Sequence, residues 1–575
     1  MSIAQQTIRP GRLEAAYREE LHHLHEGGVV EKIWAKQPGV WKSEPEHAKV
    51  IRNRLGWLEV VTPMRTDVER LRSFARDARK EGFGDVVLLG MGGSSLAPEV
   101  FSLIFPRPDG PRFHVLDSTD PGSILAVRNA LDLRRTLFVV ASKSGKTIET
   151  LSQFHYFRHR LQAQGVSPPG ANFVAITDAG SYLDQLASEY SFRQTYRNPA
   201  DIGGRYSALS YFGLLPAALC GVPVAAVLAS ALEVSEACKT FSAESNPALA
   251  LGALVGTAAR SGADKLFLLA TPTLVPLGNW VEQLVAESTG KERKGVIPVA
   301  GEVPGPLEAF GEDGVFAVLT LVGEERGPLD EFAAAAGRRG MPVVEIVLSE
   351  REQLGGEFFK WEFATAVAGA VLQVNPFDEP NVQEAKDLTA RVLEGFQSSG
   401  KMPTGSPLDA HDGVELFASE SLAGRLAAPR AADSLRAFLN RRKRGDYLAL
   451  LAYLDRNAAN EAALQQLRVF LRDRLKMPVL LGFGPRYLHS IGQLYKGGPA
   501  SGMFIELTAK NAQDVAVPGA SYTFGQLELA QALGDLQALE KHGKPAIRLH
   551  FTRGTDAGLA ALEGLFADAL PSTVH

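Results

Sequence analysis

The sequence predicts an α/β protein in which two sets of strands form doubly wound, mainly parallel sheets. Short apolar runs rich in β-branched residues recur between helical stretches over residues 86–176, and again over residues 265–348. The runs at 86–89 and 137–141 each end in a cluster of Gly, Ser and Thr. Strands that are buried on both faces form continuous apolar runs, and their alternation with helices indicates parallel sheets.

In chain order, residues 1–80 carry apolar residues at helical spacing and are expected to form a helical cap on the first sheet. Residues 81–262 are expected to form the first α/β domain. Its strands are predicted at 86–89, 113–116, 137–141 and 173–176, and an Ala-rich helical region follows from 207 to 260.

A second α/β domain is expected at residues 263–380, with strands at 265–270, 315–322 and 342–348. Residues 381–476 are expected to be a helical insertion with a polar loop at 404–413. Residues 477–575 are then expected to complete the second sheet with strands at 478–482, 503–507 and 546–551.

Composition limits the classes of function. A chain of 575 residues is too long to fold around a single hydrophobic core of typical size, so two or three packed units are expected. The net charge of −5 gives no broad attraction for nucleic acid or membranes, so an anionic ligand has to be held by local charge. The two cysteines, Cys220 and Cys238, lack metal-ligand and disulfide spacing, which indicates the cytoplasm. Because there is no signal-peptide pattern and no apolar run near the ~20 residues that span a bilayer, we expect neither secretion nor membrane insertion.

Two hydroxyl-rich turns predict a phosphate site. Gly90-Met-Gly-Gly-Ser94 follows the first strand, and Ser142-Lys-Ser-Gly-Lys-Thr147 follows the third. Small residues at such turns let the backbone approach an anion, while N–H groups, hydroxyls and the helix dipole attract it. A plain helix N-cap needs one hydroxyl, whereas the second turn offers three beside Lys143, so phosphate binding is favoured over a turn without a ligand.

Each of the other candidate polar residues, taken alone, is explained at least as well by a structural role as by a functional one. Arg205 follows two glycines at the start of a helix, and Glu287 lies one helical turn after Gln283. Glu287 at a helix end suits a general base, although a solvated glutamate is the commoner case. Lys386 could equally be an ordinary surface lysine, and His489 could be a structural histidine. His22, His23 and His25 lack a ligand set, and Arg441-Arg-Lys-Arg444 is expected to be a solvated helix end.

Five motifs together resemble those of the phosphoglucose isomerase family, whose members contain two sugar-isomerase modules of doubly wound α/β type. They cover most of residues 85–500. The motifs are Gly90-Met-Gly-Gly-Ser94, Ser142-Lys-Ser-Gly-Lys-Thr-Ile-Glu-Thr150, the Gly-Gly-Arg-x-Ser-like segment 201–210, Glu287-Ser-Thr-Gly-Lys291, and Phe377-Asp-Glu-Pro-Asn-Val-Gln-Glu-Ala-Lys386. Their joint occurrence is far more specific than any one of them.

This chain departs from the family pattern in two respects. Glu379 and Asn381 stand where the family has glutamine and glycine. The family's histidine motif normally lies between the glutamate and lysine motifs, whereas its internal spacing is reproduced here at His489-Ser-Ile-Gly-Gln-Leu-Tyr-Lys-Gly-Gly498, downstream of Lys386. This order resembles the isomerase half of fused transaldolase–phosphoglucose isomerases. A transaldolase barrel would need about 250 further residues, which the first 80 cannot supply.

The resemblance implies reversible isomerisation of glucose 6-phosphate and fructose 6-phosphate through an enediolate, with no metal or organic cofactor. Glu287 would transfer the proton, Arg205 would offset the enediolate charge, and Lys386 and His489 would assist ring opening. The substrate would be bound by Gly93, Ser94, Ser142, Lys143, Ser144, Thr147 and Gln283. In the family the histidine comes from the neighbouring subunit, so a homodimer is expected. The open alternatives are an isomerase that also accepts mannose 6-phosphate and a non-catalytic sugar-phosphate sensor.

Overall fold

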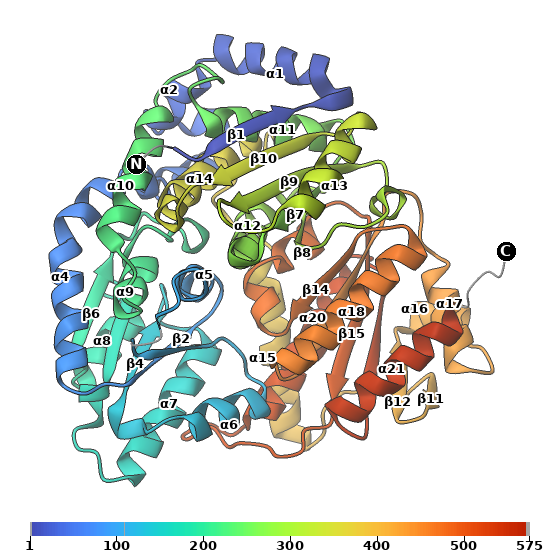
Figure 1. Cartoon of the computed structure of the whole chain (residues 1–575). Coiled ribbons are helices and arrows are strands. Elements are labelled where there is room, and N and C mark those ends of the chain that lie inside the picture. Colours follow the sequence, from blue (N-terminus) through green and yellow to red (C-terminus); the bar gives the residue numbers. More distant parts are fainter. Residues whose placement is uncertain (1–2, 108–109, 571–575) are drawn as a thin grey trace. The chain divides into compact units, whose positions relative to one another are not determined.

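The computed structural model describes residues 3–107 and 110–570. These residues form two compact units (Figure 1). Unit 1 contains residues up to 117, 130–304 and 312–379, and unit 2 contains residues 118–129, 305–311 and those from 380 onward. The ends of the predicted cap and C-terminal segment, residues 1–2 and 571–575, lie outside the described residues. No helix in the described part of the chain has the length and apolar character to cross a membrane.

The first sheet of unit 1 is entirely parallel, with the strand order β3-β2-β4-β5-β6. Buried apolar side chains fill its central strands on both faces, as expected for a sheet that helices cover on two sides. The strands are β2 (Asp85–Gly90), β3 (Arg112–Leu116), β4 (Thr136–Ala141), β5 (Phe173–Asp178) and β6 (Gln194–Asn198). The associated helices are α5 (Leu96–Ile104), α7 (Ile148–Ala163), α8 (Tyr182–Glu189) and α9 (Tyr211–Leu219).

The second sheet of unit 1 has the order β1-β10-β9-β7-β8. Its parallel strands are β7 (Lys265–Ala270), β8 (Ile297–Glu302), β9 (Gly314–Leu321) and β10 (Val343–Leu348). Its helices are α10 (Val224–Ala237), α11 (Pro247–Arg260), α12 (Val275–Thr289), α13 (Gly327–Arg338) and α14 (Leu354–Leu372). Every residue of α14 is buried, and this helix packs against α10, α11 and α12. One hydrophobic core therefore joins both sheets of unit 1.

The N-terminal region is helical as expected, except for its first element. Helices α1 (Glu14–Glu26), α2 (Val29–Trp34), α3 (Pro45–Arg52) and α4 (Val61–Lys80) follow a short strand, β1 (Gln5–Arg9). This strand pairs antiparallel with β10, and Ile8 lies opposite Val344. The prediction of a purely helical cap on the first sheet is therefore wrong at β1, which extends the second sheet.

Unit 2 contains a sheet of its own, with the order β11-β12-β16-β15-β13-β14. The strands are β11 (Asp409–His411), β12 (Val414–Ala418), β13 (Tyr447–Tyr453), β14 (Val479–Phe483), β15 (Gly502–Ala509) and β16 (Ala546–Phe551). Strands β13 to β16 are parallel, and β12 runs antiparallel to β16. The helices are α6 (Pro121–Ala130), α15 (Val382–Ser399), α16 (Glu420–Leu426), α17 (Ala431–Leu439), α18 (Ala458–Leu475), α19 (Gly492–Gly497), α20 (Phe524–Lys541) and α21 (Thr555–Ala569).

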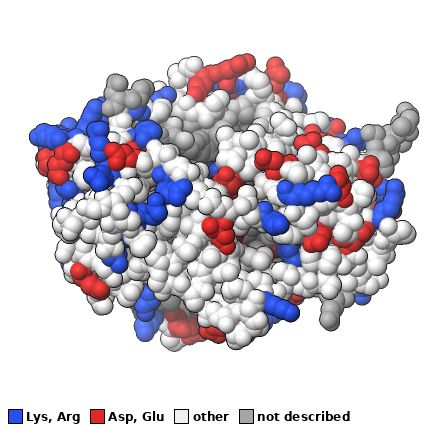
Figure 2. Space-filling view, turned by 90° about the horizontal axis from the view of Figure 1, so that it is seen from below, with Lys and Arg blue, Asp and Glu red and all other residues white. Residues whose placement is uncertain are grey.

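The structure confirms the α/β fold class with parallel sheets but corrects two expectations about residues 381–575. Strand β13 lies inside the segment expected to be helical, because a short run of buried Leu and Ala fits either a strand or a buried helix. The C-terminal strands pair with β13 and not with the strands of 263–380, so they do not complete the second sheet. On the face shown in Figure 2, basic and acidic side chains are interspersed, consistent with the small net charge.

Candidate active site

The two hydroxyl-rich turns lie next to each other at one edge of the first sheet of unit 1. Strands β2 and β4 are hydrogen-bonded neighbours, and Gly90 lies opposite Ala141 at their carboxyl ends. The turn that contains Gly93 and Ser94 therefore adjoins the loop that begins at Ser142. Their position matches the carboxyl edge at which open α/β sheets bind ligands.

Hydrogen bonds within the second turn hold it in a closed form. The Ser142 hydroxyl lies 2.9 Å from the Thr147 hydroxyl and accepts a bond from the Gly145 N–H at 3.1 Å. Gly145 has a φ of +71°, and a Cβ there would lie 2.2 Å from the backbone nitrogen of Leu183. Ser144 is exposed, and Thr147 directly precedes α7, where the helix dipole favours an anion. The turn therefore presents hydroxyls at a helix N-terminus.

Close backbone packing connects the first turn to the arginine segment. A Cβ on Gly93 would lie 2.2 Å from the carbonyl oxygen of Gly204, so only glycine allows this approach. The Ser207 hydroxyl donates to the Gly93 carbonyl at 3.3 Å. This contact places Arg205, which follows Gly204, beside the turn that contains Gly93 and Ser94.

Arg205 is buried, with 3% of its side chain exposed, and is surrounded by acceptors. Its Nη1 lies 3.0 Å from Glu287 Oε1 and 3.1 Å from Glu379 Oε2. Its Nε donates to the Ser288 hydroxyl at 2.9 Å, and its Nη2 donates to the carbonyl oxygens of Pro376 and Asp378. Because every arm of the guanidinium is bonded, its orientation is fixed, and the structural alternative of an exposed arginine is excluded.

Glu287 lies near the end of α12, between a cation and an amide. Gln283, one helical turn earlier, donates from its Nε2 to Glu287 Oε2 at 3.2 Å, while Arg205 contacts the other oxygen. Burial raises the pKa of Glu287; Arg205 opposes this shift, Glu379 adds to it, and Lys291 and Gln283 oppose it. Such a carboxylate is a stronger base than an exposed glutamate, as proton abstraction requires.

Sequence reasoning did not identify the polar groups that surround the base. Lys291 is buried, and its ammonium donates to Asp378 Oδ1 at 2.7 Å. Burial, together with the charge of Arg205, lowers the pKa of Lys291 to about 8. Asn375 donates to the other Asp378 oxygen at 3.0 Å, and His47 lies 3.3 Å from that oxygen. Lys291 and Asp378 belong to motifs recognised in the sequence, but the pairing between them depends on tertiary structure.

Lys143 is held away from the hydroxyls of its own turn. Its ammonium donates to Asp178 Oδ2 at 2.6 Å and to the Ala200 carbonyl at 2.8 Å. Burial raises the pKa of Asp178, and Lys143 opposes that shift. In this arrangement Lys143 stabilises the loop, and its role as a phosphate ligand stays a prediction.

Lys386 and His489 belong to unit 2, whereas the other predicted site residues belong to unit 1. Lys386 is exposed on α15, about one turn from the start of the helix at Val382. His489 is half-buried at the end of a short helix that follows β14.

Within unit 2, a pair of hydrogen bonds joins the histidine motif to the lysine motif. Gln493 accepts a bond from the Asn381 N–H and donates to the Asn381 side-chain oxygen, both at 2.8 Å. Asn381 stands where the family has glycine, and its side chain gives Gln493 a second contact. The displaced histidine motif is therefore attached to the turn that precedes Lys386.

Taken together, unit 1 has the features of a doubly wound α/β protein with hydroxyl-rich turns and a largely buried carboxylate at its candidate site. The chain belongs to the phosphoglucose isomerase family. The model of that family, described as phosphoglucose isomerase, matches residues 57–317. Glucose-6-phosphate isomerase of Rubrobacter xylanophilus is 31% identical over 373 residues, which cover 56% of this chain and 86% of the relative. The enzyme of the same name from Thermus thermophilus is 30% identical over 385 residues, covering 59% and 90%.

Solved structures agree on the fold. A hypothetical protein from Thermus thermophilus superposes with a TM-score of 0.57 at 26% identity, covering 68% of this chain and all of that one. A glucose-6-phosphate isomerase from Chlamydia trachomatis superposes with a TM-score of 0.53 at 20% identity, covering 67% and 86%.

Proposed function

We propose that this protein catalyses the reversible isomerisation of glucose 6-phosphate and fructose 6-phosphate. Family membership gives the reaction class, and the relatives named above are glucose-6-phosphate isomerases. The single observation that carries the chemistry is the largely buried Glu287, whose side chain is 12% exposed, is bonded by Arg205 and Gln283 and has a raised pKa. Aldose–ketose interconversion needs such a base to move a proton between C1 and C2.

The hydroxyl-rich turns bind the 6-phosphate in this proposal. Ser94, Ser142, Ser144 and Thr147 supply hydroxyls, and the start of α7 supplies backbone N–H groups. The phosphate is remote from the reacting carbons, so its binding energy orients C1 and C2 against the base without taking part in the chemistry.

Glu287 removes a proton from one carbon and returns it to the other. The intermediate is an enediolate, whose negative charge needs a fixed cation nearby. Arg205 supplies this cation, and its fixed orientation means that little reorganisation accompanies charge development. Gln283 orients the second carboxylate oxygen of Glu287.

Lys386 and His489 move protons at the ring oxygen and the O1 hydroxyl during ring opening. Their motifs are joined within unit 2 by the bonds between Gln493 and Asn381. We expect a His489→Ala variant to slow turnover of the cyclic sugar phosphate more than that of an open-chain analogue. Equal slowing of both substrates would remove this role.

Two finer features belong to the proposal. The motif order, with the histidine after the lysine, supports a relationship to the isomerase half of bifunctional transaldolase–phosphoglucose isomerases. We also propose a homodimer, in which His489 completes the site of the neighbouring subunit, and a cytoplasmic location, which the scarcity of cysteine supports. A mass measurement that finds an active monomer at assay concentration would contradict the dimer.

A coupled assay tests the function directly. Production of glucose 6-phosphate from fructose 6-phosphate is followed through a dehydrogenase that oxidises glucose 6-phosphate. We expect turnover without an added cofactor for the isomerase itself. Saturable binding of fructose 6-phosphate without turnover would instead identify a sugar-phosphate sensor, and turnover of mannose 6-phosphate in a parallel assay would broaden the substrate range.

A further inference from the structure

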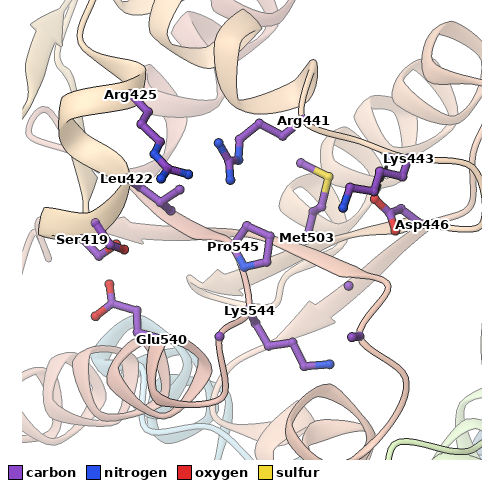
Figure 3. A pocket seen from close by; sticks show the side chains of 14 residues that line it. Ser419, Leu422, Arg425, Arg441, Lys443, Asp446, Met503, Glu540, Lys544 and Pro545 are labelled. Atoms are coloured by element: carbon purple, nitrogen blue, oxygen red, sulfur yellow. Dashed lines mark hydrogen bonds between the residues drawn. The ribbon is translucent and has the colours of Figure 1, made fainter.

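Unit 2 contains a cavity of about 390 Å³ lined by basic side chains (Figure 3). Arg425 comes from α16, Arg441 and Lys443 come from the loop after α17, and Lys544 comes from the loop before β16. Ser419 and Ser421 add hydroxyls that lie 3.0 Å from each other. In Figure 3 the guanidinium groups of Arg425 and Arg441 point toward the same space.

The cavity lies at the opposite edge of the sheet from the predicted catalytic histidine. Asp446 directly precedes β13, Gly502 and Met503 begin β15, and Pro545 directly precedes β16. These strands are parallel, so the cavity is at their amino ends. His489 follows the carboxyl end of β14, which is parallel to β13. The cavity is therefore separate from the part of unit 2 that carries the predicted ring-opening group.

The charges around the cavity favour an anion. Within the described part of the chain, the structure gives no carboxylate partner to the side chains of Arg425, Arg441 and Lys443. Lys544 is buried and donates to the Pro499 carbonyl, which holds its ammonium group in place. Converging cations of like charge repel, and a bound anion relieves that repulsion.

Two acidic residues, Glu540 and Asp446, also line the cavity, and the four basic residues outnumber them. Burial raises the pKa of Glu540. Asp446 accepts a hydrogen bond from the Lys443 backbone N–H at 2.7 Å, which orders the basic loop. Leu422, Met503 and Pro545 add an apolar part to the lining, and the volume lies in the range of small-molecule sites.

We propose that this basic pocket, defined by Ser419, Arg425, Arg441, Lys443 and Lys544, binds a small molecule that carries a pyrophosphoryl group or two phosphoryl groups. Two arginines provide planar donor forks for phosphate oxygens, and two lysines provide point charges. A single phosphate would leave part of this charge uncompensated, whereas a group with two phosphorus centres can contact cations from both sides of the cavity. The cavity is concave and of limited size, which suits a small molecule.

The basic run at 441–444 offers a matched test. Arg441 and Lys443 line the pocket, whereas Arg442 and Arg444 do not, although all four belong to one segment. Arg442 instead donates to the Leu439 carbonyl. The variants R441Q/K443Q and R442Q/R444Q remove the same number of charges, so they separate a pocket from a diffuse electrostatic effect.

The experiment titrates inorganic pyrophosphate, and in parallel ADP, into the full-length protein by calorimetry, with thermal unfolding as a check of folding. We expect saturable binding that falls at least about tenfold in R441Q/K443Q and less than about threefold in R442Q/R444Q. ADP binding at least as tightly as pyrophosphate gives further support, because the apolar lining then contacts the organic part.

Isomerase turnover separates this site from the proposed active site. R441Q/K443Q is expected to keep isomerase activity within about twofold of the parent, and a Ser142→Ala variant is expected to keep pyrophosphate binding. Equal losses of affinity in both double variants, absence of saturable binding in the parent, or loss of pyrophosphate binding in Ser142→Ala would overturn the proposal. None of these results depends on whether the parent isomerises sugar phosphates.

Discussion

Glu379 offers the sharpest test of the electrostatics around the base, because its carboxylate shares one nitrogen of Arg205 with Glu287. The two carboxylates lie 3.1 and 3.0 Å from Arg205 Nη1. Their oxygens are therefore no more than about 6 Å apart, where like charges repel by about 3 kcal/mol at a dielectric of about 20 and by about 0.7 kcal/mol in water. The Glu379 side chain is 42% exposed, so screening places the repulsion at about 1 kcal/mol, and this repulsion raises the pKa of Glu287.

Replacing Glu379 by glutamine removes this repulsion and leaves Arg205 free to stabilise the Glu287 carboxylate more strongly. Both effects lower the pKa of Glu287. Since the base acts in its ionised form, activity falls as pH drops through that pKa. The acidic limb of kcat/KM is therefore expected to move to lower pH by about one unit.

The assay is the pH profile of kcat/KM for fructose 6-phosphate in the parent and in Glu379→Gln. Glu81→Gln is the control, because Glu81 pairs with Arg193 and not with Arg205. The control profile is expected to match that of the parent. An unchanged acidic limb in Glu379→Gln, or a limb displaced to higher pH, would refute the assignment of that limb to Glu287.

Three further variants test the packing and the buried charges. Gly93→Ala places a Cβ 2.2 Å from the Gly204 oxygen, so it should raise KM for fructose 6-phosphate at least about tenfold and cost about 1–3 kcal/mol of unfolding free energy. Asp120→Asn should raise the unfolding temperature. Burial raises the pKa of Asp120 to about 6, so ionising this carboxyl group in the folded state costs stability as pH rises from about 4 to 6. The gain in stability from the substitution should therefore be about twice as large at pH 8 as at pH 5. Gln493→Ala loses both bonds to Asn381 and should lower turnover of the cyclic substrate more than that of an open-chain analogue.

Each of these variants has a matched control. Gly84→Ala introduces a Cβ with no atom within 4 Å, so KM should not change. Asp412→Asn removes an exposed carboxylate paired with Arg553 and should give no pH-dependent gain in stability. Gln397→Ala removes an exposed bond to Ser521 and should leave turnover unchanged. Matching behaviour of a variant and its control would contradict the corresponding argument.

The regular parallel strands of unit 1 could be predicted because their chemistry is local. Apolar runs such as 137–141 are short, rich in β-branched residues and followed by turns of Gly and Ser, so the pattern indicates a buried strand. Strand β13 has the same length but consists of Leu, Ala and Tyr, which suit a buried helix equally well. Strand β1 alternates exposed and half-buried residues at the edge of a sheet whose other strands begin some 260 residues later, so only tertiary pairing reveals it.

The residues of the candidate site could likewise be predicted turn by turn, but the contacts between them could not. Glycine at Gly93 and hydroxyls at Ser142 and Thr147 are features of single turns, and their meeting follows from the adjacency of β2 and β4. The acceptors around Arg205 come from segments 80 to about 170 residues away in the sequence. No pattern of spacing predicts that Glu379 shares the guanidinium with Glu287.

The central claim is that Glu287 carries the proton between C1 and C2 of the sugar phosphate. The direct measurement incubates fructose 6-phosphate with each protein in D₂O and follows the C1 proton signal by NMR, together with substrate affinity by calorimetry. The control is Glu282→Gln on the same helix, which lies outside the set of residues bonded to Arg205. Glu287→Gln is expected to lose exchange and turnover by about 10²–10⁴-fold while it still binds fructose 6-phosphate, because a positioned base contributes about that factor. Near-normal exchange in Glu287→Gln, or an equal loss in Glu282→Gln, would contradict the account.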